Sequence, residues 1–204
     1  SENVYAGLCI IIAAVGLLLH TAVAGFPMLI LATLVLSFGF HLFYPVQSSM
    51  VVKSCRPSER ASRMGLINSV AAASSLVALA FVLLISRLLG NADYDLIHLI
   101  AGVSALAGGV MVLRRKTGAT EKPTTVLDFN VKYASYYVLT FLGGARRHVN
   151  ATFAGYLLVQ TYMTPVSTMV LLSAISSLVA IFTRPLIGRL IDRWGEQKSL
   201  VLNY

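Results

Sequence analysis

The sequence predicts an all-α membrane protein with six transmembrane helices, and three observations carry that prediction. Hydrophobic residues make up 57% of the 204 residues and charged residues only 12%, about half the charged fraction of a soluble domain. Several apolar runs reach the length of about 20 residues that a helix needs to cross the hydrocarbon core. Lysine and arginine fall almost entirely in alternate loops between these runs.

The six apolar runs divide the chain into two groups joined by one polar segment. The predicted spans are approximately Val4–Val23, Met28–Val51, Met64–Ile85, Leu96–Leu113, Tyr133–Thr161 and Pro165–Ile187. Helices are expected because lipid offers the backbone no hydrogen-bond partners. The segment 114–132 carries Pro, Gly, Thr and charges of both signs. We therefore expect four helices in 1–113, a linker in 114–132, and two helices plus the start of a third in 133–204.

The basic residues predict the orientation of the chain. The loops after the second, fourth and sixth spans hold twelve Lys and Arg residues, whereas the loops after the first, third and fifth hold only Arg87. The positive-inside rule places the basic loops in the cytoplasm. The N-terminus, the linker 114–132 and the segment 188–198 are thus expected to be cytoplasmic, in a cell membrane. The net charge of +8 follows from this topology and does not indicate nucleic-acid binding.

Two adjacent arginines near the middle of the fifth span predict a functional site. Arg146 and Arg147 lie midway between tyrosines that bracket the span, as interfacial aromatic residues do. On insertion scales the pair costs roughly 5–7 kcal/mol at the bilayer centre. A helix that only spanned and packed would not carry this cost.

The helical neighbours of the arginines extend the candidate site. Arg147 shares a face with Tyr136 and Thr140, and Arg146 shares one with Asn150. A guanidinium group offers a planar fork to a carboxylate or phosphate, so these five residues are predicted to bind substrate. The alternative is a buried ion pair with an acid from elsewhere, since none of the eight acidic residues lies mid-span.

Polar residues in other spans have weaker assignments. His41, Tyr44 and Gln47 share one face of the second span and are predicted to bind substrate, or His41 to take part in proton coupling. A histidine satisfied within helix packing is an equal alternative for His41. Asn68 fits helix packing, and Arg184 fits a side chain that reaches towards the membrane interface.

Two loop motifs resemble those of the major facilitator superfamily. The segment 188–198 resembles the family's cytoplasmic loop motif, although Glu196 and Gln197 stand where the family has basic residues. Its matching positions are Gly188, Asp192, Arg193, Gly195 and Lys198. The segment 56–65 resembles the P-x-x-E-R-x-x-x-G loop, with Glu59 and Arg60 as its charged pair. The resemblance implies a twelve-helix fold of two six-helix bundles, of which these spans are helices three to eight.

The resemblance also implies a function. The family would make this chain a secondary active transporter of a small solute that works by alternating access, with Asp192 and Arg193 as gating residues. The arginines favour an organic anion, and the coupling ion is expected to be a proton. No cofactor, metal or enzymatic activity is expected, because no acid pair, ligand cluster or activated nucleophile is present. A transport-inactive sensor or scaffold is the alternative; a multidrug exporter is disfavoured because the third span lacks that group's Gly-Pro-rich motif.

Overall fold

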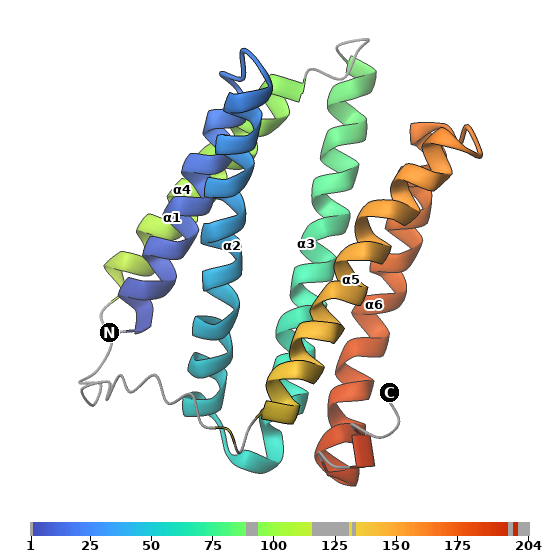
Figure 1. The fold of residues 1–204 in the computed structure, drawn as a ribbon. Coiled ribbons are helices and arrows are strands. Elements are labelled where there is room, and N and C mark those ends of the chain that lie inside the picture. The colour runs from blue at the N-terminus through green and yellow to red at the C-terminus, as the bar shows by residue number, and fades with distance from the viewer. Residues whose placement is uncertain (1, 89–93, 116–130, 132–133, 196–197, 200–204) are drawn as a thin grey trace. The chain divides into compact units, whose positions relative to one another are not determined.

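Six long helices make up almost all of the described chain (Figure 1). The computed structural model describes residues 2–88, 94–115, 131, 134–195 and 198–199, apart from the side chains of 86, 88, 136, 146–148, 150–152 and 166–167. The elements are α1 Glu2–His20, α2 Phe26–Ser54, a 3-10 turn η1 Pro57–Glu59, α3 Arg60–Leu88, α4 Tyr94–Arg114, α5 Ala134–Gln160 and α6 Val166–Trp194. All six predicted spans therefore form helices.

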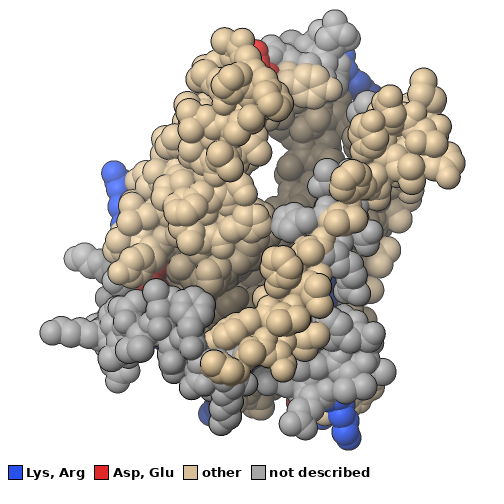
Figure 2. All heavy atoms as spheres, viewed as in Figure 1, with Lys and Arg blue, Asp and Glu red and all other residues tan. Residues whose placement is uncertain are grey.

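The described helices have the length and apolar character of membrane spans. Five stretches, in α1, α2, α3, α4 and α6, are long and apolar enough to cross a membrane. The remaining helix, α5, is 27 residues long and contains the arginine pair. Large apolar side chains such as Phe38, Val77 and Phe182 are more than half exposed, and charged side chains are sparse on the face shown in Figure 2. Exposed apolar side chains along such helices are typical of membrane proteins.

Two of the basic loops are shorter than the sequence predicted. Helix α2 continues to Ser54 and α3 starts at Arg60, so only a five-residue connection remains. Helix α6 runs through Pro185 and Gly188 to Trp194, so most of the motif predicted as a loop is helical. The helix ends at Gly195, which has a left-handed φ of 83° and donates its N–H to the Ile191 carbonyl at 2.9 Å. Glycine adopts this conformation without the steric cost of a Cβ atom.

The chain forms two compact units. The first contains residues 1–120 and 177–204, and the second contains 121–176. The boundary between them falls inside α6, so the second part of that helix belongs to the first unit. Of the predicted linker 114–132, the structure describes only Arg114, which ends α4, Arg115 and Val131, so the division at this linker stays a prediction.

Helices α1, α2 and α4 pack closely in the first unit because glycines line their contacts. A Cβ atom on Gly39 of α2 would lie 2.4 Å from the Ala13 nitrogen of α1, and one on Gly16 would lie 2.3 Å from the Leu36 nitrogen of α2. A Cβ on Gly109 of α4 would lie 2.8 Å from the Ile11 side chain of α1. Close backbone approach through small residues is the usual way for helices to associate in lipid, where the hydrophobic effect does not drive them together.

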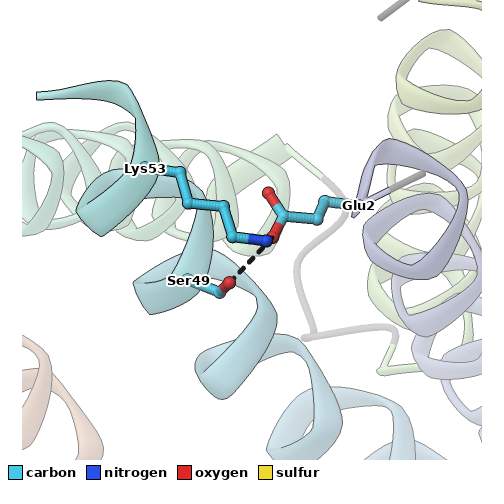
Figure 3. Close-up of polar contacts among 3 residues, drawn as sticks. All are labelled: Glu2, Ser49 and Lys53. Atoms are coloured by element: carbon cyan, nitrogen blue, oxygen red, sulfur yellow. Dashed lines mark hydrogen bonds and ion pairs between the residues drawn. The ribbon is translucent and has the colours of Figure 1, made fainter. Parts of the chain in front are cut away.

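Polar contacts gather several helix ends at one end of the first unit. Lys53 of α2 forms an ion pair with Glu2 of α1, with 2.7 Å between Nζ and Oε1, and Ser49 donates to the same oxygen at 2.8 Å (Figure 3). Asn3 donates from Nδ2 to the Arg115 carbonyl at 3.2 Å, just beyond α4. The start of α1 thus lies beside the ends of α2 and α4. We call this end, which carries Lys53, Arg114 and Arg115, the basic end.

Candidate functional site

The arginine pair lies at the centre of α5. Arg147 is the central residue of this helix, with thirteen helical residues on either side, and Arg146 precedes it. Thr140 lies seven residues before Arg147 on α5 and is exposed. Seven residues are almost two helical turns, so the two positions share a face. Tyr136 and Asn150 are also in α5. The side chains of Tyr136, Arg146, Arg147 and Asn150 lie outside the described residues.

The polar face predicted on α2 is accessible and contains an aromatic cluster. His41 and Tyr44 are exposed, and Gln47 is half-buried. The ring of Phe40 meets that of Tyr44 edge-on at a centroid distance of 4.9 Å and that of His41 at 6.0 Å. Such edge-to-face contacts orient rings relative to one another. An imidazole, a phenol and an amide thus lie on one face of α2, beside an aromatic ring.

Asp192 joins the end of α6 to the start of α3. Its carboxylate accepts the backbone N–H of Ala61 at 3.0 Å and that of Ser62 at 2.8 Å, and it also accepts the Ser62 hydroxyl. The first N–H groups of a helix have no partners within the helix, and the helix dipole favours negative charge there. A carboxylate in this position stabilises the contact by about 0.3–1 kcal/mol, and by up to about 2 kcal/mol where it is partly buried.

Two motif glycines allow this contact to form. A Cβ atom on Gly188 of α6 would lie 2.5 Å from the Ala61 carbonyl oxygen, and a Cβ on Gly65 of α3 would lie 2.5 Å from the Arg184 carbonyl oxygen. Any side chain at either position would push the two helices apart. Both loop motifs thus meet at one place, which we call the α3–α6 seam: residues 61–69 of α3 and 181–192 of α6.

The remaining motif residues, among them the predicted gating residue Arg193, lie around this seam without a comparable contact. Glu59 ends the turn η1, where its N–H donates to the Arg56 carbonyl at 3.0 Å. Arg60 is the first residue of α3 and is half-buried. Arg193 and Lys198 are exposed. Within the described residues, no side-chain hydrogen bond or ion pair is found for Glu59, Arg193 or Lys198.

Three further contacts were not anticipated from the sequence. Arg184 donates from Nη1 to the Asn68 carbonyl at 2.6 Å, and Ser69 donates to the Ile181 carbonyl at 2.6 Å. Away from the seam, the rings of His20 and His98 stack at a centroid distance of 5.2 Å. Pro185, a proline within an apolar run, is the only signal in the sequence that could have pointed to the Ser69 contact.

The helices and the seam define a multi-pass α-helical membrane protein. A sequence model of the Major Facilitator Superfamily matches residues 4–204. The chain therefore belongs to the Major Facilitator Superfamily, as the two loop motifs predicted. Its general function is membrane transport. No curated protein and no solved structure matches the chain.

Proposed function

We propose that this protein moves a small organic anion across the membrane by alternating access, driven by an ion gradient. The position of Arg147 at the centre of α5, next to Arg146, carries the anion assignment. Central arginines are costly in lipid, so they are retained where they face a water-filled cavity or a charged partner. A carboxylate or phosphate group on the substrate supplies that partner and accepts a bidentate contact.

The α3–α6 seam supports the alternating-access part of the proposal. Asp192 binds the first turn of α3 through three hydrogen bonds, and such a contact closes one side of a passage between the two helices. Its modest energy of about 0.3–2 kcal/mol suits a gate that must reopen in each cycle. Rocking of two bundles about a midplane site is how many secondary transporters work.

The polar face of α2 carries a separate set of proposed substrate contacts. Tyr44 and Gln47 offer hydrogen-bond donors to the substrate, while His41 offers an imidazole, a side chain that carries protons in many proteins. An imidazole in such a position couples anion movement to proton movement, because the charge of one affects the binding of the other. We therefore assign His41 to proton coupling.

Uptake into vesicles tests the proposed function. In vesicles containing the purified protein, a labelled small carboxylate or organophosphate should accumulate when an inward proton gradient is imposed, and a protonophore should abolish the accumulation. Neutral and cationic solutes of similar size are the controls. Uptake confined to those controls would contradict the anion assignment. The absence of uptake for every solute class would favour a transport-inactive sensor or scaffold.

We also propose that the basic end faces the cytoplasm, and Cys55 provides a test. Cys55 follows α2 at this end and is a free, half-buried thiol, whereas Cys9 is buried within α1. A membrane-impermeant maleimide should label Cys55 in inside-out vesicles but not in intact cells. The Cys55→Ser variant, which should lose this labelling, is the control. Labelling of Cys55 in intact cells would reverse the assigned orientation.

A further inference from the structure

Helix α6 contains a proline beside the α3–α6 seam, and this leaves one backbone carbonyl without its helical donor. Pro185 lies inside α6 and has no N–H group. In an uninterrupted helix, the N–H of residue 185 would bond to the carbonyl of Ile181, four residues earlier. An unpaired carbonyl in a membrane protein costs free energy because lipid supplies no replacement donor.

A hydroxyl group from the neighbouring helix supplies the missing donor. Ser69 of α3 donates from Oγ to the Ile181 oxygen at 2.6 Å, close to the usual length of an O–H···O bond. Ser69 is only 7% exposed, so water does not compete readily for this bond. By contrast, Ser74 of the same helix is exposed and bonds within its own helix, to the Val70 carbonyl at 3.0 Å.

The surrounding contacts hold the two helices close enough for this bond. Gly65 packs against the Arg184 carbonyl and the Pro185 Cα, and the Arg184 guanidinium donates back across the seam to the Asn68 carbonyl at 2.6 Å. The hydroxyl bond therefore exists only while α3 and α6 are packed together. When they separate, the Ile181 carbonyl loses its donor.

We propose that Ser69 is a positioning residue for the transport cycle, which favours the closed α3–α6 seam by completing the hydrogen bonding that Pro185 interrupts. This inference rests on the proposed alternating-access function. Asp192 adds a charged contact at the end of the seam, and the Ser69–Ile181 bond adds a neutral one farther into the helices. The cost of unpairing the Ile181 carbonyl makes opening less favourable, so Pro185 and Ser69 together set the balance between closed and open states.

A double-mutant cycle tests this role. Spin labels would be attached at Arg63→Cys of α3 and Arg189→Cys of α6, which are both exposed positions, in the otherwise cysteine-free protein in vesicles. Double electron–electron resonance would then report the distance between α3 and α6. Ser69→Ala should raise the ratio of open to closed seams about tenfold, equivalent to about 1.4 kcal/mol. In the Pro185→Ala background, where position 185 regains its N–H, Ser69→Ala should change the ratio less than about twofold.

Matched variants separate the hydroxyl bond from general effects of mutation. Ser69→Thr keeps the hydroxyl and should retain the original ratio of open to closed seams. Ser74→Ala removes a serine from the same helix and should also leave this ratio unchanged. Asp192→Asn should favour the open seam in either background, because its contact does not involve Pro185. The role of Ser69 would be refuted if Ser69→Ala had the same effect in both backgrounds. It would also be refuted if Ser69→Ala had no effect in the protein that keeps Pro185.

The same measurement separates this inference from the function on which it rests. If the unmutated protein shows two seam distances while the effects of Ser69→Ala and Pro185→Ala simply add, that result would contradict only the role of Ser69. One unchanging distance, unaffected by ion gradients and by Asp192→Asn, would contradict the proposed gate and the role of Ser69 with it.

Discussion

Arg147→Ala is expected to abolish anion uptake, reducing its rate at least about 100-fold. A hydrogen bond to a charged group contributes about 1.5–3 kcal/mol, so losing a bidentate pair costs roughly 3–6 kcal/mol. Each 1.4 kcal/mol corresponds to a factor of ten. Arg147→Lys should retain part of the uptake, since it keeps the charge but not the planar fork. Initial rates of labelled uptake into vesicles, at matched protein content, would measure both effects.

An arginine outside the proposed site provides the control for this experiment. Arg87 lies in the last turn of α3, outside the proposed site, and Arg87→Ala should leave uptake within about twofold of the unmutated protein. Arg146→Ala should lie between the two, because adjacent helical residues point about 100° apart and do not contact one ligand equally. Undiminished anion uptake by Arg147→Ala would rule out the proposed anion site.

Gly39→Ala is expected to disrupt the packing of α1 against α2. The added Cβ would lie 2.4 Å from the Ala13 nitrogen and 2.6 Å from the Cys9 carbonyl oxygen, and neither backbone atom can move without displacing its helix. Overpacking usually costs about 1–3 kcal/mol, and a clash with backbone on this scale falls at the upper end or above it. The folded yield in detergent and the thermal unfolding midpoint should both fall.

Gly108→Ala is the matched control because it makes the same substitution in α4, another helix that packs against α1. A Cβ on Gly108 would meet nothing within 4 Å. Alanine is favoured over glycine in a helix interior by up to about 1 kcal/mol, so this variant should be as stable as the unmutated protein or slightly more so. Equal unfolding midpoints for Gly39→Ala and Gly108→Ala would show that the close α1–α2 contact is not important for stability.

Some features of the site were predicted from local chemistry. The motif residues Gly188 and Asp192 were identified by the resemblance of their segment to a loop of the major facilitator superfamily, and both take part in the contact between α3 and α6. His41 and Tyr44 were grouped by helical periodicity and lie on one exposed face of α2. Their roles in gating and binding stay predictions. Periodicity succeeds here because residues three or four apart in a helix are neighbours whatever the rest of the fold does.

Other features depended on contacts between distant parts of the chain. Ser69 and Ile181 are 112 residues apart, and no local pattern pairs a hydroxyl group with a carbonyl at that separation. The extension of α6 through Pro185 and Gly188 was also missed, since both residues signal a helix end when considered alone. The Ser69 donor and the close approach at Gly188 make the continued helix favourable, and both require α3 beside it.

The sequence by itself determined the class of protein and the order of its membrane spans. Apolar runs of sufficient length must become helices in lipid because each backbone group needs a partner within its own segment, and the basic residues between those runs predict the side on which each loop lies. Only the tertiary structure decided how Asp192 binds the first turn of α3 and which donor completes the helix at Pro185. Those contacts depend on the packing distance between α3 and α6. Gly65 and Gly188 permit a short distance but do not specify it.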